Sequence, residues 1–513
     1  EITTRLVGSE MCIRDRLGIA LLFACSDDNT EPPAPVPVEP DEASVELNLT
    51  EVQIPRAGGS AEVTVVSNYE DWEMECGETW LSVQKSGNKL ILSAAENASL
   101  KRNVATVTIT VQGEGENNTA SATLSVIQND AALVIGIELP DGAKMTAPVV
   151  GQMNCTIDWG DGTVDAIEGY FDGLFTPQPS HIYRKGGTYQ IRIAGQMPMM
   201  DIGLSFDDVQ AGYITEVIQW GNTGLVSMDR ALKGCVNLIR IPGDTDGSFT
   251  EVTEFSNAFY NCKSLTEIPA DLFVNCSKVT TFAFCFQDAG LRAVPAGLFD
   301  NCSAAKTFIS AFSNCYMNSL PDELFSKCVS VTTFSSVFYR CQLLQSIPEN
   351  LFKGCENVEK FSYAFRGCPS LTEIPEGLFR FCPLANDFSG VFTMCYSLKT
   401  LPEGLFAGNP KAESFGYCFM DCTSLAEIPA GLFSANRAVK SFQGTFRGCL
   451  RVSGESPYVV VNGTKVHLYE RSKYGGQFIA PDKYEYCFSD CTGLTDYSYM
   501  EKNYPEWSNT YLK

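Results

Sequence analysis

Between about Ala231 and Leu450 the apolar residues recur every three positions. Each stretch has an aromatic residue, then a cysteine, then an aliphatic residue, then a further apolar residue. One full period contains this series twice, as Phe259, Cys262, Leu265 and Ile268 and then Phe273, Cys276, Val279 and Phe282. Such spacing fits neither a long strand nor a long helix. It predicts short straight pieces joined by tight bends, with one apolar edge facing a shared axis.

The series repeats with a fixed period. The prolines that close successive copies are 26 or 27 residues apart, at Pro242, Pro269, Pro295, Pro321, Pro348, Pro375, Pro402 and Pro429. One copy cannot bury its own apolar edge, so neighbouring copies must stack. The sequence therefore predicts a solenoid over residues 197–450.

Cysteine forms two columns in this alignment of copies. The first contains Cys235, Cys262, Cys315, Cys341, Cys368, Cys395, Cys422 and Cys449, with Ala289 in the third copy. The second contains Cys276, Cys302, Cys328, Cys355 and Cys382, followed by Asn409 and Asn436. Because Ala and Asn take the same places, an obligatory disulfide is excluded there, and we expect small buried groups that hydrogen-bond to the bends. A metal array is disfavoured, because the chain has no Cys-x-x-Cys pair and two histidines.

Two copies show a family likeness, FRGCPSLTEIP at 365–375 and FMDCTSLAEIP at 419–429. The region resembles the BspA-like leucine-rich repeats of bacterial surface proteins, and ITEVIQWGN at 214–222 resembles the segment that opens such arrays. The resemblance implies a curved right-handed solenoid with one short parallel strand per coil. We place that strand at the L-x-x-I-P stretches, where proline ends it. The symmetry of the half-repeats leaves a second short strand open.

Alternation of apolar and polar residues takes over in residues 43–129. It predicts half-buried strands at Glu62–Val66, Lys89–Leu92, Ala105–Val111 and Ala122–Gln128. Glycine- and asparagine-rich turns separate them. Short strands at this spacing predict a β-sandwich.

This segment resembles a BACON domain through Trp80–Val83, Asn97, Arg102 and Val126–Gln128. That family is associated with glycan binding but often serves only as a spacer, and both readings stay open. No tight group of exposed aromatics marks a sugar platform, although Tyr69 and Trp72 are candidates to begin one.

A second small β-domain is predicted at residues 130–196. IDWGDGT at 157–163, HIY at 181–183 and GTYQIRI at 187–193 resemble a PKD-type sandwich, in which His181 is structural. Asp161-Gly162 is a hairpin-turn signal. Asp158 and Asp161 supply two carboxylates, too few alone for the roughly six to eight oxygens around calcium, and calcium binding is left open.

The regular repeat spacing is interrupted after Cys449, in residues 451–513. Added strands are predicted at Tyr458–Val461, Lys465–Tyr469 and Gln477–Ala480, with Asn462-Gly463 as a hairpin turn. Phe488, Cys491, Leu494 and Tyr497 then restore one half-repeat. We expect this segment to cap the open end of the stack.

The first 42 residues follow none of these patterns. Residues 1–16 resemble a translated sequencing adapter and are set aside. LGIALLFAC at 17–25 is the apolar core of an export signal and resembles a lipoprotein box, which implies that Cys25 carries lipid. SDDN at 26–29 resembles an acidic tag that sends lipoproteins to the outer face of some Gram-negative cells. The proline-rich residues 26–42 are expected to form an extended tether.

The net charge of the chain narrows the classes of partner that it is expected to bind. The net charge of −24 over 513 residues disfavours nucleic acid and anionic membrane surfaces. Contact with the membrane is therefore expected only through the lipid, on the extracellular face of the outer membrane.

No motif points to catalysis, since G-x-S-x-G, H-E-x-x-H and a glycine-rich phosphate loop are all missing from the sequence. We predict a non-enzymatic protein without cofactor or metal. One hypothesis is an adhesin whose repeats face a protein or glycoprotein of a host or neighbouring cell. A second is a glycan-binding accessory in polysaccharide or mucin capture, with the BACON-like domain as binder or spacer. A third is a spacer without a ligand.

The binding positions on the repeats are expected to be the variable ones within the predicted strands. They are Thr266, Glu267, Arg292, Gln345, Thr372, Glu373, Lys399 and Glu427. Their mixed chemistry argues against one ligand unit read coil by coil and favours a protein partner. The alternative is that they form only a solvated face.

Overall fold

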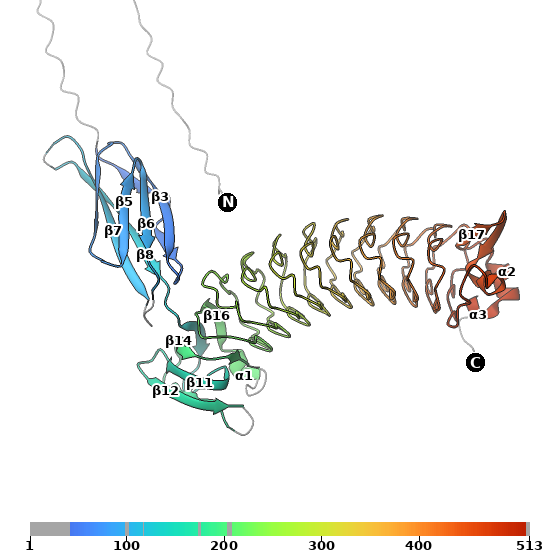
Figure 1. Ribbon diagram of the computed structural model, residues 1–513, viewed down its shortest axis with the longest axis horizontal. Helices are drawn as coiled ribbons and strands as arrows, with labels where there is room; N and C mark the ends of the chain where they lie inside the picture. Colours follow the sequence, from blue (N-terminus) through green and yellow to red (C-terminus); the bar gives the residue numbers. More distant parts are fainter. Residues whose placement is uncertain (1–41, 98–101, 116, 173–175, 203–207, 509–513) are drawn as a thin grey trace, which may run out of the picture.

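The computed structural model describes residues 42–97, 102–115, 117–172, 176–202 and 208–508. The adapter-like segment, the export signal and Cys25 lie outside these ranges, as does most of the tether. The protein is mainly β, in several small sheets. Figure 1 shows two β-domains at one end of a long, gently curved row of stacked coils and a small cap at the other end. No helix in the described ranges is both long and apolar enough to cross a membrane.

The first domain consists of two four-stranded sheets around one core. Their strand orders are β1-β3-β6-β5 and β2-β8-β7-β4. The strands are β1 (Val45–Leu47), β2 (Glu51–Ile54), β3 (Gly59–Ser67), β4 (Trp72–Cys76), β5 (Leu81–Ser86), β6 (Lys89–Ala94), β7 (Asn103–Gln112) and β8 (Thr119–Gln128). The four strands predicted from alternation lie within β3, β6, β7 and β8. Val63, Leu92 and Val107 are fully buried between the sheets, as alternation requires.

The second domain is a mixed set of strands whose main sheet has the order β12-β11-β14-β9-β16. Its strands are β9 (Leu133–Leu139), β10 (Lys144–Thr146), β11 (Val149–Asp158), β12 (Val164–Phe171), β13 (Ser180–Ile182), β14 (Gly187–Gln196), β15 (Met199–Met200) and β16 (Ile214–Gln219). The short helix α1 (Asp208–Ala211) precedes β16. Strand β16 pairs with β9, and its Glu216 bridges to Arg240 in the first coil. The sheet therefore continues directly into the row of coils, with one shared core.

The coils between residues 220 and 457 are built from turns and isolated parallel bridges. One continuous ladder joins neighbouring coils just before the second-half phenylalanine, through Glu254, Thr281, Thr307, Thr333, Lys360, Asp387, Ser414, Ser441 and Lys483. The predicted placement of the principal strand at L-x-x-I-P is therefore wrong, and the half-repeat that had been left open carries the ladder. The L-x-x-I-P stretch is short and ends in a residue without an N–H. It makes about one hydrogen bond per coil, such as Thr372 N to Gln345 O at 3.4 Å.

A second ladder runs through turns with left-handed residues. In one coil Asn257 and Asn261 have φ of 55° and 61°. The N–H groups of Phe255, Asn257, Phe259 and Asn261 donate to the next coil at 2.8 to 3.0 Å. Alternate residues thus pair with the neighbour as in a parallel strand, although the backbone is a chain of turns.

Three phenylalanine stacks fill the core of the row. Ring centroids of neighbouring coils lie 5.1 to 6.2 Å apart within a stack. The stacks begin at Phe255, Phe259 and Phe273 and take one ring from each following coil. Each ring packs against its copies above and below, so burial depends on the neighbouring coils.

The cysteine columns lie beside these rings as buried free thiols, as predicted. Cys368 Sγ donates to the carbonyl of Phe338 in the preceding coil at 3.3 Å, and Cys395 Sγ to that of Phe365 at 3.3 Å. In the second column Asn436 Nδ2 donates to two carbonyls, Phe406 O at 3.1 Å and Asn409 O at 2.8 Å. Cys and Asn therefore share one role, which is donation to the previous coil.

The cap contains β17 (Tyr458–Val461), β18 (Thr464–His467), the 3-10 helix η1 (Leu468–Tyr474), α2 (Tyr497–Asn503) and α3 (Pro505–Ser508). The first hairpin strand and its turn were predicted correctly. The second strand ends at His467, where η1 begins, and residues 477–480 form no strand, so both of those predictions need correction. Trp507 of α3 packs near Phe488 at 6.4 Å and accepts a hydrogen bond from Phe488 N at 2.8 Å, which covers the last ring of its stack.

Candidate functional site

The row of coils has a groove where two consecutive coils are one residue short. Full coils have two residues between the cysteine and leucine columns, as in CKSL at 262–265 and CQLL at 341–344. The two coils between them have one residue there, in AGL at 289–291 and CYM at 315–317. These are the copies that give the 26-residue proline spacings. Their edge is drawn in, and the full coils on either side form the walls.

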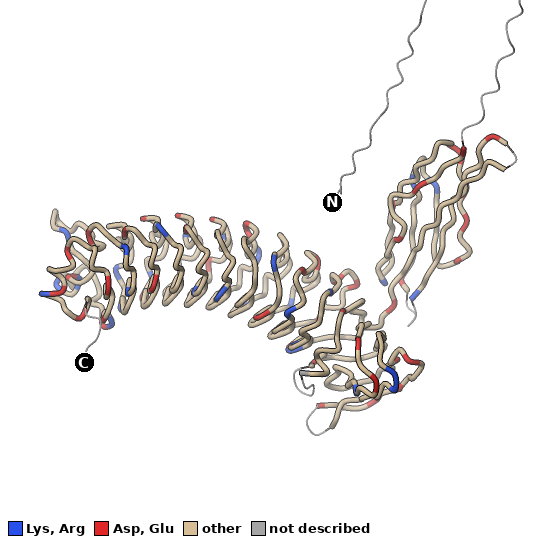
Figure 2. Tube along the Cα trace, turned by 180° about the vertical axis from the view of Figure 1, so that it is seen from behind, with Lys and Arg blue, Asp and Glu red and all other residues tan. Residues whose placement is uncertain are grey.

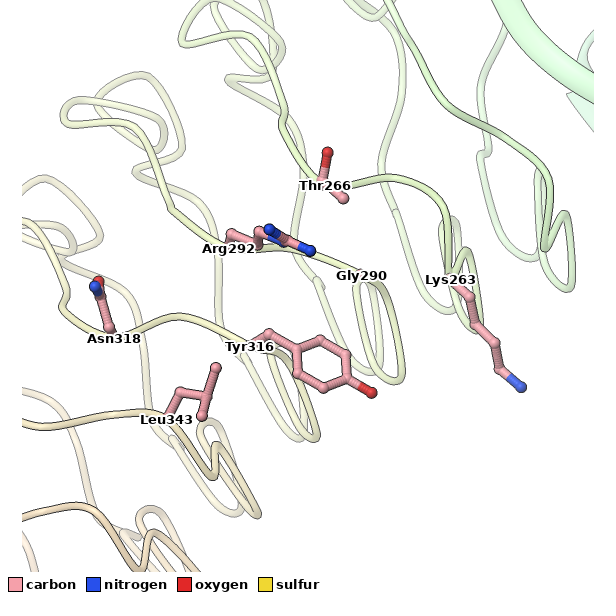
Figure 3. Close-up of a pocket in the computed structure, with 7 residues that line it drawn as sticks. All are labelled: Lys263, Thr266, Gly290, Arg292, Tyr316, Asn318 and Leu343. Atoms are coloured by element: carbon pink, nitrogen blue, oxygen red, sulfur yellow. The ribbon is translucent and has the colours of Figure 1, made fainter.

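Seven residues line this groove, which holds about 590 Å³: Lys263, Thr266, Gly290, Arg292, Tyr316, Asn318 and Leu343. Figure 3 shows Tyr316 and Lys263 on opposite sides of the turn that contains Gly290. Tyr316 is 53% exposed and Leu343 49% exposed, so both offer apolar surface to a ligand. A volume of this size is in the range that takes small ligands.

Gly290 allows two coils to approach closely at the groove. A Cβ at this position would lie 2.1 Å from the carbonyl oxygen of Lys263. The two coils approach this closely because Gly290 N donates to Cys262 O at 3.1 Å. A side chain at this position would collide with the backbone of Lys263, so the contact between these two coils requires glycine.

The groove is positively charged. Its lining contains Lys263 and Arg292 and no carboxylate. Within the described part of the chain neither cation takes part in an ion pair, whereas Lys278 in the opposite half-repeat pairs with Glu251 at 2.6 Å. Figure 2 shows acidic and basic residues mixed along the row, so this local excess of positive charge differs from its surroundings.

The structure places the predicted binding residues on one edge of the row. Seven of the eight are exposed and Thr266 is half-buried. Arg292 N donates to Thr266 O at 3.1 Å and Lys399 N to Thr372 O at 3.3 Å, so these positions follow each other from coil to coil. We call this edge, at the residue after the leucine column and its neighbour, the variable face. Leu371 and Ile374 point inward, at 0% and 6% exposure.

Only Thr266 and Arg292 of those eight belong to the groove. Sequence reasoning missed Lys263, Gly290, Tyr316, Asn318 and Leu343. The two 26-residue spacings were the signal that would have identified them, because a shortened coil between full coils must leave a hollow.

A Ser-His-Asp cluster lies in the cap but lacks the geometry of a nucleophile site. Ser456 Oγ donates to Asp496 Oδ2 at 2.5 Å and lies 2.9 Å from His467 Nδ1. In a catalytic triad the histidine stands between serine and carboxylate. Here His467 Nδ1 lies 3.6 Å from the same Asp496 oxygen, Tyr469 donates to it as well, and Ser456 is fully buried. The cluster ties β18 and η1 to the start of α2.

The histidine of the second domain also has a structural role. His181 Nε2 lies 2.7 Å from Asp161 Oδ2, and its ring stacks on Trp159 at 5.4 Å. Asp158 Oδ1 accepts the Gly160 N–H at 2.9 Å. Both carboxylates therefore serve the turn. No group of three or more His, Cys, Asp or Glu side chains in the described ranges is arranged to hold a metal ion.

The first domain has a shallow pocket of about 440 Å³ beside Tyr69 and Lys85. Trp72 is only 6% exposed, and Lys85 Nζ lies 4.3 Å from the centre of its ring. The suggestion that Trp72 begins a sugar platform is therefore wrong, because its ring belongs to the core.

Comparison with known proteins adds no match: the chain matches no protein-family model, no curated protein and no solved structure.

Proposed function

We propose that this chain is a cell-surface lipoprotein of the BspA-like leucine-rich-repeat kind that binds a partner without catalysing a reaction. In this proposal Cys25 carries the lipid anchor at the outer face of the outer membrane. The tether and two β-sandwich domains, BACON-like and PKD-like, then act as spacers for a solenoid. The solenoid presents its variable face to a protein or glycoprotein of a host or neighbouring cell.

The observation that carries this proposal is the continuity of the variable face. Its exposed side chains succeed each other coil by coil over a rigid core of stacked rings and buried thiols. A stable protein interface takes roughly 800 Å² from each partner, which requires several coils at once. Side chains of mixed charge and polarity on a rigid surface suit a protein partner that is itself irregular.

The burial of the thiols supports a binding role for the row over a chemical one. Desolvation raises the pKa of Cys341, Cys355 and Cys395 to about 12. Nucleophilic cysteines have lowered pKa values and partial exposure. These thiols have neither, so they serve the packing of the coils.

The test is affinity capture of surface proteins from host cells with the full chain and two matched variants. The first replaces Thr372, Glu373 and Lys399 by Ala on the variable face. The second replaces Thr332, Glu413 and Lys440 by Ala, which removes the same three residue types from exposed positions of the opposite half-repeat. We expect the first to weaken capture by about tenfold or more and the second to leave it unchanged, with equal melting curves. Equal capture by both variants would contradict the proposal.

A further inference from the structure

We propose that the groove of the two short coils binds an acidic sugar, meaning a saccharide that carries a carboxylate or sulfate group. This inference rests on the proposed function and names one ligand class for the same array. It starts from the lining of the groove, which contains an exposed aromatic ring and two cations that form no ion pair within the described ranges.

Charge selects an anion. The whole chain has a net charge of −24, so a free anion is repelled by most of the surface and attracted where Lys263 and Arg292 stand without a lining carboxylate. The acids nearest to these cations along the chain are Glu267 and Asp288, and neither lines the groove. A guanidinium binds carboxylate or sulfate through two parallel N–H bonds, and a lysine adds a second charge.

The remaining lining suits a sugar. Tyr316 offers a half-exposed ring, against which the C–H face of a pyranose packs, with Leu343 beside it. Asn318 and Thr266 supply an amide and a hydroxyl, which both donate and accept hydrogen bonds as sugar hydroxyls require. In Figure 3 these groups come from successive coils, with Asn318 and Leu343 on the far side of Tyr316 from Lys263.

The length of the groove limits the ligand. It spans four coils, from Lys263 to Leu343, and the ring stack beneath advances by 5.1, 5.5 and 5.8 Å over the three steps. The two full coils close both ends at about 16 Å. The groove therefore takes a short oligosaccharide or the end of a longer chain.

An extended acidic peptide fits less well. Peptides commonly bind by pairing their backbone with free backbone groups of a sheet edge. In the groove these groups are already used, because Arg292 N donates to Thr266 O at 3.1 Å and Tyr316 N to Leu291 O at 2.8 Å. A peptide with several carboxylates would also carry more negative charges than the two cations of the groove can pair.

Coil seven, the coil that ends at Pro402, provides an internal control. Tyr396 and Lys399 occupy the columns of Tyr316 and Arg292, and Tyr396 is 44% exposed. This coil has the full length, and so do its neighbours. The same residue types are therefore present there without the hollow.

The experiment is titration calorimetry of the full chain with four probes: sialyllactose, sulfated lactose, neutral lactose and a hexaglutamate peptide. We expect one or both acidic lactoses to bind and lactose to bind about tenfold more weakly or not at all. The tighter of the two acidic probes identifies carboxylate or sulfate as the preferred group. Arg292→Gln should weaken binding by about tenfold, and Tyr316→Ala should weaken it severalfold. Tyr396→Ala should leave it unchanged, with all melting curves equal to that of the parent chain.

Several outcomes overturn the inference. Equal binding of lactose and the acidic lactoses would remove the role of charge. Tighter binding of hexaglutamate would assign the groove to acidic peptides. Equal losses from the groove and coil-seven variants, or no binding of any probe, would show that the hollow is not a site. In each case capture of a protein through the variable face remains a separate result, so the proposed function can stand when this inference fails.

Discussion

Removal of the Arg471 side chain should loosen the end of the row of coils. Arg471 is 2% exposed, and its guanidinium donates to Asn436 O at 2.9 Å and Phe433 O at 2.8 Å. One coil earlier, Asn436 donates to the equivalent carbonyls of Phe406 and Asn409. Arg471 is therefore the last donor of the second column, supplied by the cap instead of by a further coil.

The magnitude follows from what Arg471→Ala leaves behind. Two buried carbonyls lose this donor, at about 1–3 kcal/mol each. The contacts with the Phe442 and Phe478 rings, at 5.3 and 4.7 Å, are lost as well. Arg471→Ala also removes the desolvation cost of the buried guanidinium, which offsets part of this loss of stability. That burial lowers its pKa to about 9, and it has no carboxylate partner in the described ranges. We expect a net destabilisation of the cap by about 2–4 kcal/mol.

The assay is hydrogen exchange of the native protein, read by mass spectrometry on peptides along the row. Because each coil contacts only its neighbours, protection should fall in the last coils and the cap and stay unchanged near Phe259. Lys473→Ala is the control, since Lys473 is 55% exposed and the loss of its surface contacts with Glu470 and Tyr504 should matter little. Unchanged protection at residues 433–456, or an equal loss in the first coils, would refute the idea that a terminal donor closes the column.

Four further predictions concern the core, the thiols and the anchor. Leu371→Ala should cost about 2–5 kcal/mol in urea unfolding while Thr372→Ala stays within about 0.5 kcal/mol; equal effects would contradict the assignment of inward and outward positions. Alkylation under denaturing, non-reducing conditions should label the repeat cysteines as free thiols. Burial holds their pKa above the ordinary 9.0, so the folded state keeps more protons above pH 9. Its stability should therefore fall as the pH rises above 9, and a flat profile from pH 8 to 10 would refute this. Cys25→Ala behind an intact signal should abolish incorporation of a fatty-acid probe, and retained label would remove the lipid anchor from the account.

The sequence predicted which residues form the core of the coils. The three-residue spacing was enough, because every member of the series from Phe259 to Phe282 is buried as expected. Asn409 and Asn436 in the cysteine columns also predicted the shared donor role. Both inferences depend on burial and hydrogen-bonding capacity, which are properties of single side chains repeated many times.

The backbone conformation of the coils could not be predicted from the spacing of their side chains. Phe284, Tyr363 and Met394 have φ of 59° to 61°, although such residues rarely adopt the left-handed region. Stacking between coils imposes that conformation, and the intrinsic backbone preferences of these residues do not predict it. The same stacking determines which half-repeat carries the bridge ladder, which is why the predicted strand was placed on the wrong half.

The groove and the cap are two further features that the sequence analysis did not predict in full. The shortened copies around Gly290 and Tyr316 were visible in the proline spacings, so the hollow could have been predicted from a loss of one residue in adjacent coils. The cap helices α2 and α3 were not predicted. Each helix is too short to show a helical period in the sequence. The position of Trp507 depends on its packing against Phe488, a ring from another part of the chain.

The most direct test of the central claim, that the row of coils is the binding surface, compares the captured surface partner's affinity for three proteins. These are the full chain, the variant with Thr372, Glu373 and Lys399 changed to Ala, and a fragment of the first domain, residues 42–129, which has a core of its own. Our account predicts that the variant binds about tenfold more weakly or worse while melting like the full chain, and that the fragment does not bind. Full affinity in the fragment, or an unchanged affinity in the variant, would contradict it.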